Sequence, residues 1–163
     1  GFEHLLSDRV VLDLHSLPDD RIKQALAELM IVRLHGHLVR GAQPRALRRL
    51  LVFDEAWRVK DSKRLEEHAR EGRAFGVGIV VGTQYPRDVP EVLAGSLETQ
   101  VFLSNREAEH QRTIVRALCG ATSGAAASAL LAKVGALQKH QAFLKNSQHS
   151  PYTLVTMIPH YQR

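Results

Sequence analysis

The sequence has little cysteine and no long apolar segment. Its 163 residues include a single cysteine, Cys119, which excludes an internal disulfide and fits a reducing compartment. No apolar run approaches the roughly 20 residues that a helix needs to cross a bilayer. The nine histidines are scattered, so no Cys/His cluster has the spacing of zinc ligands. These absences argue against a disulfide-stapled secreted domain, a membrane-spanning segment in this chain and a structural zinc site.

What is present is the composition of an ordinary globular protein. Hydrophobic residues make up 44% and charged residues 24% of the chain, which indicates neither a disordered nor a membrane protein. A chain of this length can bury about 70% of its unfolded surface in one core. We therefore predict one compact domain over residues 1–163. The net charge of +5 favours contact with polyanions, although an excess of this size is also common in proteins that never touch nucleic acid.

The most informative segment, residues 49–55, reads RLLVFDE. Four bulky apolar residues without alternation are typical of a strand covered on both faces, as in a parallel sheet. Ligands bind at the carboxyl ends of such strands, where Asp54 and Glu55 fall. One carboxylate there can hold a hydrated Mg²⁺ ion while the other polarises an attacking water. The alternative is that both acids simply cap the following helix.

A second strand of the same kind is predicted over residues 78–82, GIVVG, and is followed by Thr83 and Gln84. If it lies beside the first strand, Gln84 points into the same crevice. There its amide could sense a terminal phosphate or hold the attacking water. A highly charged segment, residues 60–76, joins the two strands.

The order of these segments resembles the HerA/FtsK superfamily of hexameric DNA-pumping ATPases, which includes HerA-like translocases and conjugative and type IV secretion ATPases. The resemblance is carried by LLVFDEA at 50–56, REGRAFGVG at 70–78 and GTQYP at 82–86, and it covers roughly residues 8–105. It implies an α/β fold, a RecA-like P-loop NTPase core with a mainly parallel sheet flanked by helices. The cofactors that it implies are ATP and Mg²⁺.

The resemblance also implies residue roles and partners. Asp54 would bind the magnesium ion through water, Glu55 would contact the nucleotide and be the general base, and Gln84 would couple the γ-phosphate state to movement. The implied partners are DNA, further copies of the chain in a hexameric ring, and a nuclease or a secretion channel. The implied location is the cytoplasm or the inner face of the membrane. DNA end processing, conjugation and secretion are not distinguished, and DNA-binding residues are not assigned.

The phosphate-binding loop is the one departure from the family pattern. That loop needs Gly-Lys followed by Ser or Thr, so that backbone N–H groups and the lysine hold the phosphates, and no glycine in this chain precedes a lysine. We expect this chain to be the C-terminal part of a larger ATPase whose loop lies upstream. A homologue that never had the loop is the alternative. In either case this polypeptide alone is expected to bind ATP poorly and hydrolyse little.

Arg73 precedes a Phe-Gly turn that leads into the second strand. A residue at the start of that strand would face away from its own subunit's nucleotide. In a ring, Arg73 could reach the neighbouring subunit's ATP as an arginine finger and stabilise charge on the transferring phosphoryl group. The alternative is a surface arginine paired with Glu67 or Glu71.

Two further groups of basic residues are visible. The first has no nearby acids and could contact phosphates, lie on a subunit seam or form a solvated loop: Arg33, Arg40, Arg45, Arg48 and Arg49. The second is interleaved with acids, as in an exposed or interfacial helix: Arg58, Lys60, Asp61, Lys63, Arg64, Glu66, Glu67, Arg70, Glu71 and Arg73.

The remaining pattern predicts alternating helices and strands. Predicted strands lie at 9–14, 99–103, 141–144 and 152–158, the last two as an antiparallel hairpin at the sheet edge. Predicted helices lie at 18–38, 91–97, 108–118 and 125–132, the last capped by Thr122 or Ser123. We interpret residues 76–78 as a tight turn.

Two other function classes remain open. One is a catalytically inactive, ATPase-like module for oligomerisation or DNA docking. The other is a helicase or recombinase of the wider RecA class, against which the Glu71-Gly72-Arg73 and Thr83-Gln84 motifs argue through resemblance alone.

Overall fold

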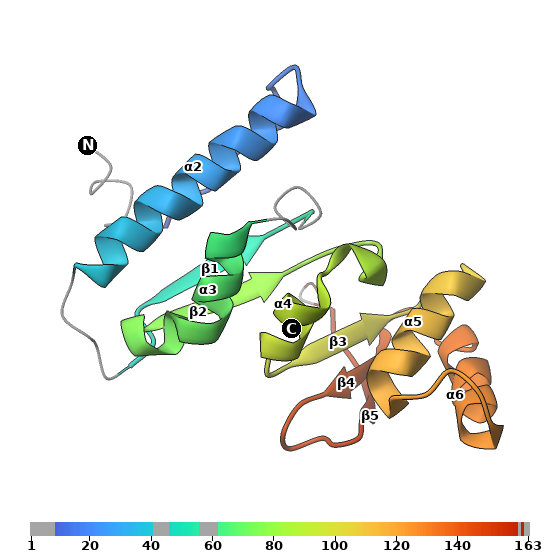
Figure 1. Cartoon of the computed structure of the whole chain (residues 1–163). Helices are drawn as coiled ribbons and strands as arrows, with labels where there is room; N and C mark the ends of the chain where they lie inside the picture. The colour runs from blue at the N-terminus through green and yellow to red at the C-terminus, as the bar shows by residue number, and fades with distance from the viewer. Residues whose placement is uncertain (1–8, 41–45, 56–61, 160, 162–163) are drawn as a thin grey trace.

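Helices and strands are mixed along the chain, and the last four elements are two helices followed by two strands (Figure 1). The computed structural model describes residues 9–40, 46–55, 62–159 and 161. Its elements are α2 (Asp20–Val39), β1 (Arg49–Phe53), α3 (Lys63–Glu71), η2 (Gly72–Phe75), β2 (Val77–Val81), η3 (Pro86–Asp88), α4 (Glu91–Ser96), β3 (Gln100–Leu103), α5 (Ala108–Cys119), α6 (Ala125–Gly135), β4 (Gln141–Lys145) and β5 (Thr153–Thr156). The predicted α/β class is confirmed. Predicted features at Arg45, Arg58, Lys60 and Asp61 lie outside the described residues.

The described strands form two sheets. β1 and β2 pair in parallel, in register from Arg49 opposite Val77 to Phe53 opposite Val81. β3, β4 and β5 form a separate antiparallel sheet in that order. The parallel pairing and the C-terminal hairpin are confirmed. β3 differs from the expected mainly parallel arrangement, because it joins the hairpin instead of extending the β1–β2 pair.

The predicted strand at residues 9–14 is wrong. This segment pairs with no described strand, and Val11 and Leu12 are 91% and 51% exposed. The backbone N–H of His15 donates to the Asp13 carboxylate at 2.8 Å, which closes a local turn directly after the apolar residues. An apolar run alone could not reveal that this segment lacks a pairing strand.

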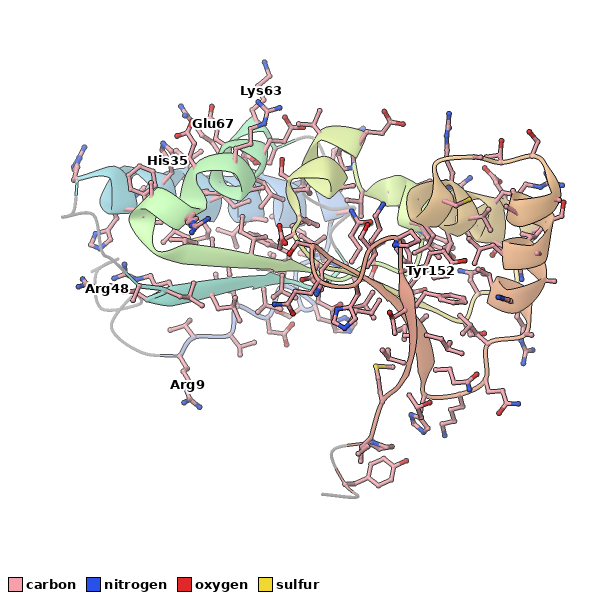
Figure 2. The ribbon with its side chains drawn as sticks, turned by 90° about the horizontal axis from the view of Figure 1, so that it is seen from below. Arg9, His35, Arg48, Lys63, Glu67 and Tyr152 are labelled. Carbon is pink, nitrogen blue, oxygen red and sulfur yellow. The ribbon has the colours of Figure 1, made fainter. Side chains whose placement is uncertain are left out.

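One face of the β1–β2 pair is covered by helices. α2 begins where the sequence indicates, with the Asp19 carboxylate accepting from the backbone N–H of Arg21 at 2.6 Å. Figure 2 shows α2 and α3 on the same side of the pair, with His35, Lys63 and Glu67, whereas Arg9 lies on the other side. The packed residues form two small cores: Ile31, Leu65 and Leu93 against Phe53, Ile79 and Val81, and Leu34, Leu38 and Val77 against Leu51 and Phe75.

The expectation that β1 is covered on both faces is wrong for the described residues. Burial alternates along β1, and Leu50 and Val52 are 56% and 65% exposed. Val80 of β2 is also exposed. The uninterrupted apolar run therefore predicted a parallel strand correctly. Its prediction that both faces of the strand are buried was wrong.

A third core lies between the antiparallel sheet and helices α5 and α6. Its centre is formed by Ile114, Val115, Leu130, Val134 and Phe143, each no more than 3% exposed. Burying such side chains stabilises a fold by roughly 1.5–3 kcal/mol each. As predicted, α5 stops at Gly120, which has a left-handed φ of 74°. The predicted cap of α6 is wrong, since Gly124, with φ of 97°, is the N-cap and makes no side-chain hydrogen bond.

α3 carries the charged segment between the parallel strands. Its N-cap, Ser62, accepts from the backbone N–H of Leu65 at 3.2 Å. The helix continues into η2, and Gly76 then turns the chain with φ of 66°. The predicted turn at 76–78 is thus confined to Gly76, because Gly78 already lies in β2. Among the described residues, no helix is both long enough and apolar enough to cross a membrane.

His68 is buried between α3 and α2. Its ring lies edge-on to that of His35, with centroids 4.9 Å apart. Burial lowers the pKa of His68 below its ordinary value of 6.5, and the nearby His35 and Arg64 add to this effect. Contacts with the backbone of Ile31 and with Glu67 oppose it. The unfolded chain therefore binds more protons than the folded one at acid pH, so protonation of His68 favours unfolding.

We expect the free energy of unfolding of this chain to fall as the pH drops below about 6.5, by at most about 1.4 kcal/mol per pH unit from this group. His68→Gln should lose that part of the pH dependence. The measurement is urea unfolding between pH 5 and pH 8, with the exposed His15→Gln as the matched control. Parallel pH profiles for the wild type and His68→Gln would contradict the assignment.

Candidate functional site

The two acids lie at the carboxyl end of the parallel pair. Asp54 and Glu55 directly follow β1, and the backbone N–H of Gly82 donates to the Phe53 carbonyl at 2.8 Å just beyond β2. A Cβ placed on Gly82 would lie 3.4 Å from Oδ1 of Asp54. The same Oδ1 accepts from the backbone N–H of Glu55 at 3.1 Å. The two strand tips are therefore side by side, with the Asp54 carboxylate against the glycine that ends β2.

Gln84 completes this edge. Its Nε2 donates to Oε1 of Glu55 at 3.0 Å, although the two residues are 29 positions apart in sequence. Asp54, Glu55 and Gln84, which sequence analysis placed at one crevice, are thus brought together by the parallel pairing of β1 and β2. Asp54 and Gln84 are exposed and Glu55 is half-buried, so all three can be reached from solvent.

Glu55 has an unusual backbone conformation. Its φ is 58°, in the left-handed region that glycine favours and that costs other residues on the order of 1–2 kcal/mol. Non-glycine residues in this region cluster at functional sites, where the surrounding structure holds them. The conformation turns the chain at the strand tip and directs the Glu55 side chain to Gln84.

The loop that carries Gln84 is anchored on α5. Thr83 Oγ1 accepts from the backbone N–H of Tyr85 at 3.2 Å, which closes a tight turn around Gln84. The Tyr85 ring contacts the ring of His110, with centroids 5.0 Å apart. Two residues further on, Arg87 pairs with Glu109 at 3.3 Å. The Gln84 loop is thus connected to the layer that contains the antiparallel sheet.

His110, which lies at this junction, was not among the predicted site residues. The residue is 1% exposed, and its Nδ1 lies 3.4 Å from Oε2 of Glu107. Neither ring nitrogen has a hydrogen-bond partner among the described residues. No spacing or motif distinguishes this histidine in the sequence, since its contact with Tyr85 depends on how α5 packs.

Arg73 lies at the opposite end of the parallel pair. It is an exposed residue of η2, just before β2 begins. The backbone N–H groups of Arg48 and Arg49 donate to the carbonyl of Gly76 at 2.8 and 3.1 Å, which places the start of β1 at the same turn. Arg73 therefore does not join Asp54, Glu55 and Gln84 within one copy of the chain.

Further arginines gather at that end. Leu38 packs with Val77 and Phe75, so the C-terminal end of α2 reaches the same edge. Glu67 pairs with Arg64 instead of Arg73. We call this region the basic edge and define it by Arg40, Arg48, Arg49, Arg70 and Arg73. Figure 2 shows Arg48 at one end of the molecule, far from Tyr152.

The site has the ligand chemistry of a hydrated magnesium ion. Carboxylate and amide oxygens are hard ligands, and Mg²⁺ is usually held by one or two carboxylates together with waters and substrate phosphates. The described residues contain no group of three or more His, Cys, Asp or Glu side chains that could enclose a metal. Asp54 and Glu55 therefore fit an ion that a phosphate ligand and water would help to hold.

Comparisons with known proteins bear on the fold. No family model and no curated protein match the chain. The genome packaging NTPase B204 from Sulfolobus turreted icosahedral virus 2, in complex with sulfate, is 15% identical over 98% of this chain and 72% of its own, with a TM-score of 0.64. The bacterial conjugative coupling protein TrwBdeltaN70 is 15% identical over 85% of this chain and 38% of its own, with a TM-score of 0.67.

B204 and TrwB have also been solved with nucleotide analogues. B204 was solved with ATP-gammaS, with a TM-score of 0.63, and the plasmid coupling protein TrwB with the GTP analogue GDPNP, with a TM-score of 0.60. This chain spans only 35% of the TrwB chain in that complex. At such low identities the similarity establishes the architecture, and the chain has the α/β fold of the RecA-like P-loop NTPases.

Proposed function

We propose that this chain is part of an ATP-hydrolysing motor that moves DNA, with its hydrolytic residues at the Asp54–Glu55–Gln84 edge. The observation that supports this most directly is the hydrogen bond from Gln84 to Glu55 between the tips of two parallel strands. In open α/β sheets that edge is where ligands bind. The similar folds that have been solved with nucleotide analogues are consistent with a nucleotide ligand.

Each residue has a defined task in this proposal. Asp54, with its exposed carboxylate, would hold the magnesium ion through water. Glu55 accepts the proton of the attacking water as general base. Gln84 donates to Glu55 through one N–H, which leaves the rest of its amide for the terminal phosphate or the attacking water. When bound, ATP supplies the phosphoryl group, and Mg²⁺ neutralises the charge that develops on it.

The position of the basic edge supports a role for Arg73 at the nucleotide of a neighbouring subunit. The arginines and the hydrolytic residues lie at opposite ends of β1 and β2, so a head-to-tail contact between copies would bring one end of each against the other. Such heterologous contacts generate rings when the rotation closes. A hexameric ring in which Arg73 reaches the neighbour's ATP is part of this proposal.

DNA is proposed as the polymer that is moved because of the two similar folds. One belongs to a protein described as the DNA-packaging ATPase of a virus and the other to a conjugative coupling protein. A nuclease or a secretion channel as partner, and a place in the cytoplasm or at the inner face of the membrane, remain proposals that the resemblance implies.

A second candidate function is an inactive ATPase-like module for oligomerisation or DNA docking. The observation that favours it is the absence of a Gly-Lys pair from the sequence, because the phosphate-binding loop requires one. The two candidates differ in whether the whole protein hydrolyses ATP.

The deciding experiment is magnesium-dependent ATP hydrolysis by the full-length protein, measured with and without duplex DNA. We expect turnover that DNA stimulates and that EDTA abolishes. If a protein whose folding is verified by circular dichroism shows no turnover under any condition, the motor function is contradicted. The inactive module would then be the supported candidate.

A further inference from the structure

The net positive charge of this protein arises in its C-terminal third. Residues 1–109 carry 16 basic and 17 acidic side chains, whereas residues 110–163 carry six basic and no acidic ones. The net charge of +5 thus comes entirely from the last 54 residues. Most of this stretch lies in α5, α6, β4 and β5, and the one acid within these elements is Glu109 in the first turn of α5.

Four of these cations lie exposed on the two helices of that layer and the turn that follows them. Arg112 and Arg116 are one helical turn apart on α5, Lys133 is in the last turn of α6, and Lys139 is in the turn before β4. We call them the cationic surface. None of the four forms an ion pair with any residue that the structure describes.

Helix packing places the end of α6 against α5. A Cβ placed on Gly135, at the end of α6, would lie 3.5 Å from Nε2 of Gln111, the neighbour of Arg112 on α5. The end of α6 therefore meets the first half of α5, and Figure 1 shows the two helices side by side at one end of the molecule. Lys145 is separate, because its Nζ donates to the carbonyl of Ala117 at 2.6 Å.

The acids nearest to this layer already have contacts. Glu109 pairs with Arg87, Glu98 accepts from the backbone N–H of Ser147 at 3.3 Å, and Glu107 lies beside His110. All three precede Arg112 in the chain. Within the described structure, none of these acids forms an ion pair with the cationic surface.

We propose that the cationic surface binds the phosphate backbone of duplex DNA. Basic side chains that neutralise phosphates release counterions, and this release supplies most of the affinity of sequence-independent binding. The choice of DNA over other polyanions rests on the proposed function. The position of the surface rests on charge and packing alone.

The apolar residues support DNA over a membrane or a protein partner. The described large hydrophobic side chains that are exposed include Leu103 and Leu154 but none between them. A membrane-surface helix inserts apolar residues into the lipid, and protein interfaces rely on buried aromatic or aliphatic anchors. The cationic surface offers neither, whereas charge without apolar anchors suits a phosphate backbone.

The test compares two charge-matched variants of the full-length protein. Arg112→Gln/Arg116→Gln removes two charges from the cationic surface, and Arg21→Gln/Lys63→Gln removes two from exposed positions on α2 and α3. The measurement is fluorescence anisotropy of a labelled DNA duplex across a salt series. We expect the first variant to lose about tenfold or more in affinity at 0.1 M salt and to reduce the salt slope by about 2, with little change in the control.

The other outcomes separate this proposal from the proposed function. If both variants bind DNA equally well and still hydrolyse ATP when no DNA is present, the cationic surface is not the DNA-binding surface. The proposed motor function would be unaffected by that result. Loss of binding to phosphatidylserine vesicles without loss of DNA binding would overturn the DNA-binding proposal in favour of a membrane. A wild-type protein that binds no DNA would overturn both. Lys133→Gln/Lys139→Gln provides a second variant if the first does not fold.

Discussion

Glu55→Gln in the full-length protein is expected to lower kcat for ATP hydrolysis by about 10²–10⁴-fold and to leave nucleotide affinity nearly unchanged. Glutamine cannot accept the proton of the attacking water. It does keep an oxygen that can accept the hydrogen bond from Gln84 Nε2, which spans 3.0 Å to Glu55 Oε1. The substitution therefore removes the base while it preserves the contact between the strand tips. Single-turnover hydrolysis and equilibrium binding of a fluorescent ATP analogue separate the two effects.

Glu71→Gln is the matched control for that substitution. Glu71 is an exposed carboxylate at the end of α3, near the opposite end of the parallel pair, so its loss should leave kcat unchanged. Undiminished turnover by Glu55→Gln would remove Glu55 from the role of base. A parallel loss of nucleotide affinity would instead indicate that Glu55 mainly helps to hold the nucleotide.

The candidate site was predictable because it follows from a single topological rule. The carboxyl ends of parallel neighbouring strands meet at one edge, so two apolar runs that end in Asp54-Glu55 and Thr83-Gln84 were enough to place their polar residues together. The rule required only that β1 and β2 be neighbours, and their register confirms this. The left-handed backbone of Glu55 was not predictable, because a glutamate carries no local signal for a positive φ.

Features that depend on distant partners were predicted less well. The segment at 9–14 has the same apolar pattern as β1 but pairs with no described strand. The sequence of β3 likewise does not show that β4 is its partner. The contact between Tyr85 and His110 depends on how α5 packs, and the sequence around either residue carries no signal for it. Local patterns identified individual elements such as the helix that begins after Asp19, whereas pairing and packing between remote segments decided the rest.

Arg73→Ala should lower ATP turnover by about 10³–10⁵-fold if its guanidinium stabilises the transferring phosphoryl group of a neighbouring subunit. Within one copy Arg73 lies at the end of the parallel pair opposite Glu55, so it cannot act on a nucleotide bound at its own Asp54–Glu55 edge. Arg70→Ala is the matched control, since Arg70 is also an exposed arginine of the basic edge. A fall of similar size for both variants would indicate a general electrostatic effect in place of a finger.

Mixing the two inactive variants tests whether Arg73 acts between subunits. A Glu55→Gln copy lacks the base but presents Arg73, and an Arg73→Ala copy lacks the arginine but retains Glu55. When the Glu55→Gln copy presents its basic edge to the Arg73→Ala copy, the nucleotide between them meets an intact Arg73 and an intact Glu55. Head-to-tail contacts produce such neighbours in any mixed ring. Turnover should therefore return on mixing if Arg73 acts in trans. No recovery, in mixed assemblies whose formation is verified by native mass spectrometry, would contradict the trans role, because a residue that serves its own subunit gains nothing from an intact neighbour.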